Sequence, residues 1–445
     1  MAAAELWKLP PTWQWVNLGE ISEVVSKGTT PTTVGCSFTK IGIPFLRAED
    51  ISGGAINPLS VAFHIDLKTH NTTLARSQLR PGDLLITIAG TLGRAGYVPN
   101  IATSLNCNQA IAFIRLKSNL MDVKFAYFAC QYNNLINSLV DVKKVATIGN
   151  LNLQQIQDFK IPLPPLSEQR RIVSMLEKAD RLRRLRRYAL ELSGTYLQAV
   201  FLEMFGDPVM NPKGWELQTL GDVVHSAQDG PHVSPDYSET GVPFLSTRNI
   251  RPGQVIWEDL KFISREEAEK HWQKCKPQWG DILYTKGGTT GLAKAIDFDR
   301  EVAVWVHIAL LKPNNKLVDS LWLESMLNSA FCYNQSQELT HGIANHDLGL
   351  TRMIKIKLYL PPLSLQREFA RIAKKYTQLL AQQKEAERQA EHLFQTLLHK
   401  AFQGDLDEAG RLSPNVEIVN QQTSSFVDIA EPINTDAYQL ALPLE

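Results

Sequence analysis

The order of apolar and polar residues predicts two kinds of segment that alternate along the chain. Short β-type runs, separated by Gly, Pro, Asn and Asp turns, fill roughly the first 150 residues of each half. Examples are residues 83–88, 110–116 and 302–311. A short helix is predicted in each of these regions, near Val123–Tyr132 and near Ser320–Ser329. We therefore expect two globular modules, each of mixed α and β structure.

A long helix is predicted at the end of each half. The segment Leu-Pro-Pro-Leu-Ser supplies a proline stop followed by a serine N-cap, at Ser167 and at Ser364. Glycine is favoured at the left-handed position that closes a helix, so Gly206 and Gly404 are the predicted ends. Each helix would contain about 38 residues and extend roughly 57 Å, at about 1.5 Å per residue.

A narrow apolar stripe follows each predicted long helix. In the second helix its positions alternate in steps of four and three, as in a heptad. Because a long helix with one narrow stripe is unstable alone, the two helices are expected to pair, and the alternative is that each packs on its own module. The residues expected to make the pairing are Ile172, Ala179, Leu182, Leu192, Ile372, Leu379, Ala386 and Leu393.

Four segments of the first half recur in the same order in the second half. They are Trp13–Ile21 and Trp215–Val223, Gly42–Leu46 and Gly241–Leu245, Gly82–Gly93 and Gly280–Gly291, and Leu163–Arg170 and Leu360–Arg367. Their separation drifts only from about 202 to about 197 residues, which indicates a duplicated domain rather than a solenoid unit. A duplication of this kind predicts a pseudo-two-fold axis, about which the two long helices run antiparallel.

The expected fold class is mixed α/β, with two α+β globular domains separated by two long antiparallel coiled-coil helices. The expected parts are residues 1–160 for the first domain, 166–206 for the first helix, 211–360 for the second domain, 364–404 for the second helix, and 405–445 for a C-terminal tail. Two interpretations of the polar tail stay open: it is disordered, or it folds back on the N-terminal segment.

Composition restricts the function classes. The 46 basic and 46 acidic residues balance, so any surface that binds nucleic acid must be a local patch or must be completed by partners. No apolar run reaches the length of about 18 residues that a membrane span needs, and the N-terminus lacks a secretion pattern. None of the five cysteines forms a Cys-x-x-Cys pair. We expect a cytoplasmic protein without a membrane segment, a metal site or a disulfide framework.

The motifs argue against catalysis by this chain. An adenine methyltransferase needs an Asn-Pro-Pro-aromatic loop, but only Asn57-Pro58-Leu59 and Asn211-Pro212-Lys213 occur. The phosphate-binding pattern Gly-x-x-x-x-Gly-Lys-Ser/Thr does not occur, and the nearest glycine-rich stretch, Gly287–Lys294, matches the turn around Gly90 in the other half. No catalytic residue and no metal ligand is therefore predicted.

The repeated motifs resemble those of the specificity subunit of type I restriction–modification systems. They are Gly-Ile/Val-Pro-Phe-Leu, Gly-Asp-Leu/Ile-Leu and Leu-Pro-Pro-Leu-Ser-x-Gln-Arg, with the helix-closing segments Phe205–Pro208 and Ala401–Leu406. The resemblance extends over residues 10–406. One departure is Leu365, where the family usually has Glu; an acid in the first helical turn stabilises by under about 1 kcal/mol, so a small effect is expected.

The resemblance implies a non-catalytic subunit whose two domains each recognise one half of an asymmetric, split DNA target. The helices would set the spacer and dock the methyltransferases. The implied partners are double-stranded DNA, two methyltransferase subunits and two restriction (motor) subunits. S-adenosylmethionine, ATP and magnesium are used by those partners, and no cofactor is expected in this chain. Two other classes stay open: an assembly scaffold whose modules bind protein, and a self-sufficient nuclease.

Candidate DNA contacts are donors and acceptors that lie beside glycine turns or at the ends of β-type runs. In the first module they are Lys27, Thr29, Thr30, Arg47, Thr91, Arg94, Lys143 and Lys144. In the second they are His232, Arg248, Asn249, Lys286, Thr289, Lys294 and His341. The basic run Arg181–Arg187 has three interpretations: a solvated helix face, a docking site for a methyltransferase, or a phosphate-binding track.

Overall fold

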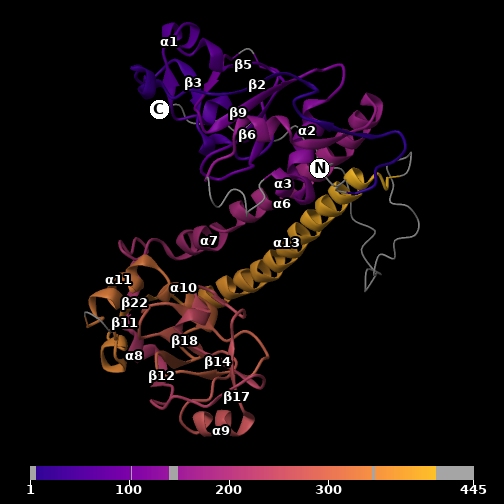
Figure 1. The fold of residues 1–445 in the computed structure, drawn as a ribbon. Helices are drawn as coiled ribbons and strands as arrows, with labels where there is room; N and C mark the ends of the chain where they lie inside the picture. The colour runs from indigo at the N-terminus through magenta and orange to yellow at the C-terminus, as the bar shows by residue number, and fades with distance from the viewer. Residues whose placement is uncertain (1–6, 102, 140–148, 343–345, 407–445) are drawn as a thin grey trace, which may run out of the picture. The chain divides into compact units, whose positions relative to one another are not determined.

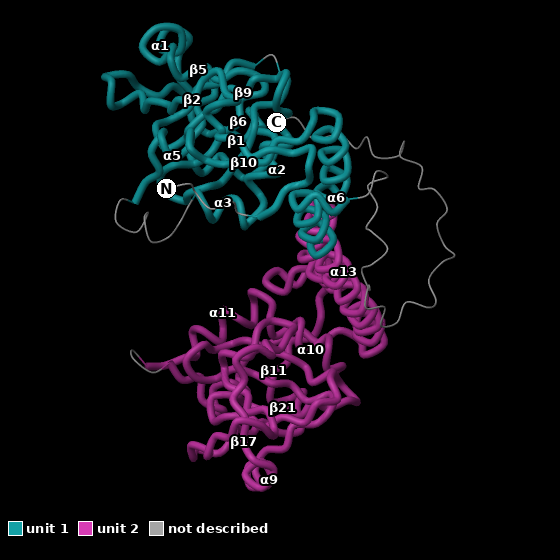
Figure 2. The backbone as a smooth tube through the Cα atoms, turned by 45° about the vertical axis from the view of Figure 1, so that its right-hand side comes forward, with its two compact units in different colours: residues 1–182, 391–445 teal, residues 183–390 magenta. Residues whose placement is uncertain are grey.

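The computed structural model describes residues 7–101, 103–139, 149–342 and 346–406. The chain divides into two compact units: unit 1 consists of residues 1–182 and 391–445, and unit 2 of residues 183–390 (Figure 2). Both divisions fall inside long helices, α6 (Leu166–Ser193) and α13 (Leu363–Gln403), so each unit contains a part of both helices. Within the described residues, no helix is long and apolar enough to cross a membrane.

Unit 1 contains two four-stranded sheets and a two-stranded pair (Figure 1). Its strands are β1 (Gln14–Asn17), β2 (Ser22–Lys27), β3 (Ile43–Leu46), β4 (His64–Ile65), β5 (Gln78–Leu79), β6 (Asp83–Thr87), β7 (Ala95–Tyr97), β8 (Leu105–Cys107), β9 (Ile111–Leu116) and β10 (Lys160–Leu163). Its short helices are η1 (Pro31–Val34), η2 (Ala48–Asp50), η3 (Pro58–Ser60), α1 (Leu67–Asn71), η4 (Ala75–Ser77), α2 (Val123–Gln131), α3 (Asn133–Leu139) and α5 (Leu153–Gln157). The sheet with the longer strands, called the larger sheet, has the antiparallel order β2-β9-β6-β7. The other, called the smaller sheet, has the order β4-β3-β8-β5.

The larger sheet of unit 1 lies between two apolar layers. Leu84 and Ile86 of β6 pack in the same cluster as Phe125 of α2, whereas Leu85 packs in a second cluster with Leu46 of β3. Successive side chains of a strand point to opposite faces of a sheet, which explains the alternation. The unit therefore stacks a helix, the larger sheet and the smaller sheet in three layers.

Unit 2 repeats this arrangement. Its strands are β11 (Glu216–Thr219), β12 (Val224–Asp229), β13 (Tyr237–Ser238), β14 (Val242–Leu245), β15 (Ile250–Arg251), β16 (Gln254–Val255), β17 (Lys261–Ile263), β18 (Ile282–Thr285), β19 (Ala293–Ala295), β20 (Ala303–Val304), β21 (Ile308–Pro313) and β22 (Lys357–Leu360). Its shorter helices are α7 (Tyr196–Phe205), α8 (Leu220–Val223), η5 (Thr247–Asn249), α9 (Arg265–Lys274), α10 (Ser320–Leu327), α11 (Ala330–Glu338) and α12 (Leu350–Met353). Tyr284 of β18 packs toward Trp322 of α10, and Leu283 packs in the cluster of Leu245 of β14. The order β12-β21-β18-β19 corresponds to β2-β9-β6-β7, so the repeat in the sequence is a repeat in the fold.

The repeated Leu-Pro-Pro-Leu-Ser-x-Gln-Arg motif fixes the start of each long helix. The side chain of Gln169 is fully buried, and its Oε1 accepts a hydrogen bond of 2.8 Å from the backbone N–H of Asp122. Its Nε2 donates to the carbonyl oxygens of Leu120 and Pro164, both at 2.8 Å. Gln366 makes the three corresponding bonds in unit 2. A buried amide satisfied in this way ties the helix to the module beneath it.

The repeated Gly-Asp motif holds a buried ion pair. Asp83 is fully buried and accepts two hydrogen bonds, of 2.9 and 2.8 Å, from the guanidinium of Arg115 on the neighbouring strand. Burial raises the pKa of the Asp83 carboxyl, and the Arg115 pair opposes that rise. Asp281 pairs with Lys312 at 2.9 Å at the equivalent place in unit 2. This motif is therefore part of the sheet framework.

The predicted serine N-caps of the long helices are wrong. The backbone N–H of Gln169 donates to the carbonyl oxygen of Pro165, and that of Gln366 donates to the carbonyl oxygen of Pro362, so the helices begin two residues earlier than the serine caps predict. Ser167 and Ser364 lie inside the first turn. Proline is tolerated at such a start because its missing N–H would have no helical partner there.

The first long helix is also interrupted, which corrects the prediction of one helix over residues 166–206. Helix α6 ends at Ser193, Gly194 lies in the turn that follows, and α7 begins at Tyr196. Glycine loses more backbone entropy in a helix than other residues, so a break at this position costs little. The predicted ends are confirmed, since the helices end directly before Gly206 and Gly404, and both glycines have a φ of 79°; the ψ of 174° at Gly206, however, is not that of the predicted left-handed cap.

Contacts between α6 and α13 inside unit 2 run in antiparallel order. The Arg186 guanidinium lies 3.4 Å from Oε1 of Gln383, and the Tyr376 hydroxyl donates to the carbonyl oxygen of Ser193 at 2.6 Å. The rings of Tyr196 and Tyr376 are 5.5 Å apart. Residues later in α6 and at the start of α7 therefore contact residues earlier in α13, as in an antiparallel pair. These contacts are polar or aromatic.

The predicted pairing residues do not form one continuous apolar stripe between the two long helices. Ile172 and Ala179 are buried in the unit 1 core, in the same cluster as Phe394 and Leu398 of α13. The remaining predicted positions are half-buried or exposed: Ile372, Ala386, Leu182 (39%), Leu192 (59%), Leu379 (48%) and Leu393 (40%). The modules take up part of each apolar stripe, which was the alternative to helix pairing. Regular coiled-coil packing stays a prediction, and most of the tail, residues 407–445, lies outside the described residues.

Candidate nucleic-acid interface

In unit 2, several loops meet at one end of the larger sheet. Strand β12 ends at Asp229 opposite Ala309, and β18 ends at Thr285 opposite Ile308, so both ends adjoin the start of β21. The backbone N–H of Leu348 donates to the carbonyl oxygen of Lys286 at 2.8 Å, which brings residues 346–349 to the same place. We call this end of the sheet, with its loops, the unit 2 edge.

A charged network occupies the unit 2 edge. The Asp229 carboxylate lies 2.7 Å from Nζ of Lys274, 3.3 Å from Nζ of Lys286 and 3.4 Å from Nε2 of His232. Lys286 also lies 3.4 Å from the Asp347 carboxylate, and its side chain is only 7% exposed. Burial alone would raise the pKa of Asp229, but the hydrogen bond from Lys274 and the charges of both lysines lower it below its usual value. Lys286 is therefore held between two carboxylates.

Histidine and threonine side chains surround this network. His307 precedes β21, and burial, together with the Lys286 charge, lowers its pKa, which keeps the imidazole neutral at neutral pH. His232 is 71% exposed, and Thr289 and His341 are also exposed. A neutral imidazole carries one donor and one acceptor, so this edge offers both kinds of group to a ligand.

The equivalent end of the larger sheet in unit 1 is the unit 1 edge. Strands β2 and β6 end at Lys27 and Thr87, beside the start of β9 at Ile111. A Cβ built on Gly28 would lie 2.0 Å from the carbonyl oxygen of Cys107. Only glycine therefore allows the segment after β2 to pass so close to the neighbouring backbone.

The unit 1 edge is made of hydroxyls and amides. The backbone N–H of Thr30 donates to Oε1 of Gln109 at 3.1 Å, and the Arg76 guanidinium lies 3.5 Å from the Thr29 hydroxyl. Lys27 is exposed, and so are Thr91 and Arg94 in the loop between β6 and β7. The position of Lys286 is taken here by Ile88, which is 4% exposed, and that of His307 by Ala110.

The structure brings together some of the predicted DNA contacts and separates others. Those at the unit 1 edge are Lys27, Thr29, Thr30, Thr91 and Arg94, and those at the unit 2 edge are His232, Lys286, Thr289 and His341. Arg47 and Arg248 follow the smaller-sheet strands β3 and β14. Lys143 and Lys144 lie outside the described residues. Whether any of these residues touches DNA stays a prediction.

Besides Lys286, the predicted residues Asn249, Lys294 and Arg47 are already engaged inside the chain. Asn249 is 7% exposed, and its Oδ1 accepts from the backbone N–H of Ser246 at 3.0 Å. Lys294 is 5% exposed and lies 2.8 Å from Asp297 and 3.3 Å from Glu324. The Arg47 guanidinium stacks on the Phe63 ring at 3.7 Å. Asn249 and Lys294 are poorly placed to meet a ligand, because their polar atoms are occupied.

Sequence reasoning missed several residues of the two edges. Arg76 and Gln109 belong to the unit 1 edge, and Lys274, His307 and Asp347 belong to the unit 2 edge. Gln109 and His307 precede the equivalent strands β9 and β21, so extending the repeat to these strands would have indicated them. Lys274 reaches its carboxylate from α9, a contact that no spacing rule indicates.

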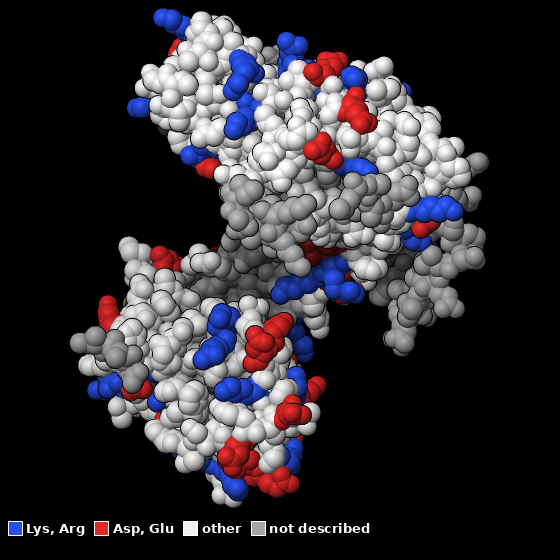
Figure 3. Space-filling model, in the orientation of Figure 1, with Lys and Arg blue, Asp and Glu red and all other residues white. Residues whose placement is uncertain are grey.

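Neither charge nor metal chemistry dominates the described surface. Figure 3 shows Lys and Arg side chains interspersed with Asp and Glu on the face in view, without one continuous basic region. Among the described residues, no group of three or more His, Cys, Asp or Glu side chains is placed to hold a metal ion. The unit 1 edge offers mainly hydrogen-bonding groups, and the unit 2 edge offers two lysines balanced by two carboxylates.

Comparisons with known proteins agree with the repeated fold. The family model described as "Type I restriction modification DNA specificity domain" matches twice, at residues 10–191 and 212–391. The chain is 22% identical over 428 residues to the putative type I restriction enzyme MjaX specificity subunit of Methanocaldococcus jannaschii, with coverage of 90% of this chain and 95% of the relative.

Two solved structures share the fold. The S subunit of a type I restriction–modification system from M. genitalium matches with a TM-score of 0.55 at 15% identity, covering 89% of this chain and 98% of that one. A chain from a structure on complex assembly and conformational transition of the type I R-M system matches with a TM-score of 0.53 at 22% identity, covering 90% of this chain and all of that one.

Proposed function

Because the chain belongs to the type I restriction modification DNA specificity family, we propose that its two edges contact the two unequal halves of a split DNA target. The observation that carries this proposal is the pair of edges itself. The repeated framework places the ends of equivalent strands at the same positions in both units. The side chains at these strand ends differ between the units. Lys286 in unit 2 corresponds to Ile88 in unit 1. Equivalent positions with different chemistry suit two half-sites of different sequence.

The chemistry of each edge suggests how it contacts the duplex. In unit 1 the hydroxyls of Thr29 and Thr30 and the amide of Gln109 can donate to and accept from base edges, while Lys27 and Arg94 suit phosphates. In unit 2 the exposed His232 and the neighbouring loops would contact the base edges. Lys286 acts through others: it holds Asp229 and Asp347 in place.

The long helices are the proposed docking surface for two methyltransferase subunits. Leu185, Tyr188 and Leu192 are 54%, 58% and 59% exposed along α6, beside the basic run Arg181–Arg187. Large exposed apolar side chains on one helix face are typical of a protein interface. The methyltransferases, and two restriction subunits that join them, would use S-adenosylmethionine, ATP and magnesium in the cytoplasm. This chain would supply specificity and no catalysis.

The test is a map of methylated adenines in genomic DNA from cells with and without this chain, together with its methyltransferase. Loss of one asymmetric, two-part motif is expected when the chain is absent. Exchange of residues 1–160 for those of another family member should alter one half of the motif. An unchanged map would favour an assembly scaffold, and cleavage of DNA by the purified chain with magnesium would favour a nuclease.

A second experiment tests the proposed role of the helices as a spacer. Removal of seven residues from α6 and seven from α13 should shorten the unread spacer and leave both half-sites unchanged. Methylome mapping of the double deletion measures the spacer directly. A motif with the original spacer would contradict this role.

A further inference from the structure

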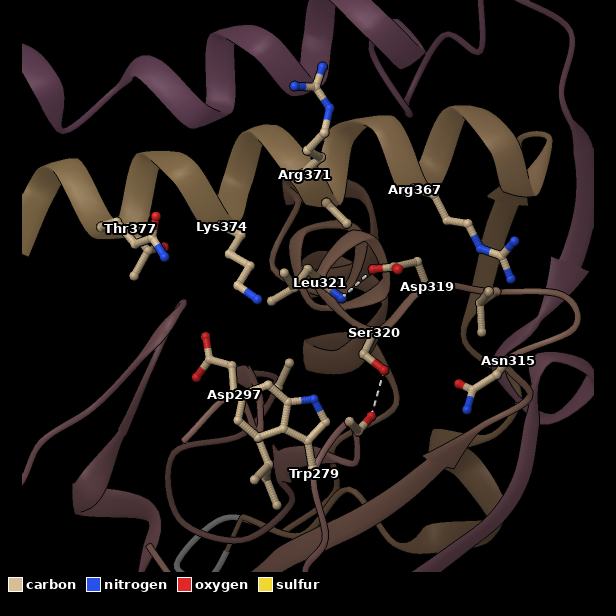
Figure 4. A pocket seen from close by; sticks show the side chains of 16 residues that line it. Trp279, Asp297, Asn315, Asp319, Ser320, Leu321, Arg367, Arg371, Lys374 and Thr377 are labelled. Atoms are coloured by element: carbon tan, nitrogen blue, oxygen red, sulfur yellow. Dashed lines mark hydrogen bonds between the residues drawn. The ribbon is translucent and has the colours of Figure 1, made fainter. Parts of the chain in front are cut away.

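A cleft of about 670 Å³ opens in unit 2 beside the first turns of α13. Its floor is apolar and includes Ala295, Ile296 and Leu321. Trp279, which is 62% exposed, lies at the side opposite α13, as Figure 4 shows. The volume is in the range of sites that enclose a small ligand or a short peptide. The unit 2 edge does not include this cleft.

Unit 1 has larger or oppositely charged side chains at some of the equivalent positions. Tyr97 of β7 occupies the strand position of Ala295 in β19, since the two residues pair with Leu84 and Ile282 in the same register. On the neighbouring helix, Lys124 of α2 forms an ion pair of 2.6 Å with Glu177 of α6. Smaller side chains and the loss of this pair leave the place open in unit 2.

The loss of the ion pair also changes the charge of the cleft. Leu321 and Lys374 occupy the positions of Lys124 and Glu177, so a cation stands where unit 1 has an acid. Figure 4 shows Lys374 and Arg367 extending from α13 on the side of Asp297 and Asn315, whereas the guanidinium of Arg371, which also borders the cleft, points to the opposite side of the helix. Within the described residues, none of these three cations has an ion-pair partner.

The two carboxylates of the cleft are already satisfied. Asp297 lies 2.8 Å from Nζ of Lys294, which comes from the buried side of the sheet. Asp319 accepts a hydrogen bond of 2.9 Å from the backbone N–H of Leu321 and caps α10. The cleft therefore presents an excess of positive charge above an apolar floor, with an aromatic ring at its side.

We propose that this cleft docks an acidic, partly apolar peptide segment of a partner subunit; the partner's identity rests on the proposed function. Carboxylates of such a segment would pair with Lys374 and Arg367, and an apolar side chain would enter between Trp279 and the floor. A DNA backbone carries charge but no protruding apolar side chain that could enter the cleft, so it would leave the floor uncovered. Because unit 1 has different side chains at the equivalent positions, the docking distinguishes the two halves of the chain.

Charge and shape can be tested separately by the binding of purified methyltransferase subunit to the full chain. The double variant Arg367→Glu/Lys374→Glu is expected to weaken binding at least tenfold, and Ala295→Tyr, which introduces the tyrosine that unit 1 has at this strand position, should do the same. Lys355→Glu, an exposed lysine of unit 2 that lies outside both the cleft and the long helices, is the matched control. Unchanged binding in both cleft variants, with circular dichroism showing a folded chain, would overturn the proposal.

The occupant can be identified in the assembled complex by photo-crosslinking from Trp279→p-benzoylphenylalanine. The expected product joins this position to a segment of a partner subunit with net negative charge, and Arg367→Glu/Lys374→Glu should reduce its yield. A crosslink to DNA, or none in a complex that still methylates its target, overturns the proposal. A complex that fails to recognise a split target would instead contradict the proposed function, so the two failures are distinguishable.

Discussion

Units 1 and 2 are built on the same framework and differ most where their strands end. Gln169 and Gln366 make the same three buried hydrogen bonds, and Asp83 and Asp281 hold the same kind of ion pair. At the edges, a network of two carboxylates and two lysines in unit 2 replaces hydroxyls and amides around Ile88 in unit 1. Framework positions resist change because every polar atom has a partner, whereas loop positions can change without unfolding the sheet.

The largest effect is expected from breaking what the units share. Gln169→Leu would leave one buried N–H and two carbonyl oxygens without partners, at roughly 1–3 kcal/mol for each group. Gln366→Leu should cost unit 2 a similar amount. Urea unfolding would measure the loss in the free energy of unfolding, and hydrogen exchange would show in which unit backbone amides lose protection. Gln395→Leu, an exposed glutamine on α13, is the control, and an equal loss there would contradict the pinning role.

A smaller and one-sided effect is expected from Lys286→Met. The variant removes the cation shared by Asp229 and Asp347, although Lys274 still pairs with Asp229. We expect the loops of the unit 2 edge to loosen by about 1–3 kcal/mol, because a nearly buried carboxylate loses one of its two lysines. The affinity of the variant is measured for target DNA in which each half-site is substituted in turn. Recognition of one half-site only should weaken. Equal losses for both halves would contradict the assignment of this edge.

The framework could be predicted from the sequence because its motifs occur twice. Two copies of Gly-Asp-Leu/Ile-Leu indicated equivalent strands, and the structure shows them as β6 and β18. The edges were predicted less well, because their contacts join distant segments. Lys294 follows a glycine turn as a ligand contact would, but Glu324, thirty residues later on α10, holds it inside. The heptad pattern likewise indicated apolar positions, but it did not show which of them pack against the modules. Phe394 and Leu398 are buried, whereas the predicted pairing residue Leu393 is exposed.

The pH dependence of stability should be more modest and should occur in both units. Burial lowers the pKa of His70 in unit 1, and burial with the Lys286 charge lowers that of His307 in unit 2, from an ordinary value of 6.5. Below about pH 6.5 the unfolded chain therefore binds more protons, so stability is complete above this pH and falls as the pH falls. Melting temperatures between pH 8 and 5 should show it. His307→Gln should flatten the profile of unit 2 only, whereas the exposed His225→Gln should not.

The smallest effect concerns the single departure in the repeated helix motif. Oε2 of Glu168 accepts a hydrogen bond of 2.9 Å from the Trp13 indole, and the acid also favours the helix dipole. In unit 2, Leu365 packs against the core, and the corresponding Trp215 donates instead to the carbonyl oxygen of Phe205 at 2.9 Å. Glu168→Leu should therefore cost about 1–2 kcal/mol. Leu365→Glu should change stability by under about 1 kcal/mol, because the gain from the dipole is offset by the lost apolar contact. Denaturant unfolding of both variants measures the difference, and a large gain from Leu365→Glu would show that the second copy lacks only the acid.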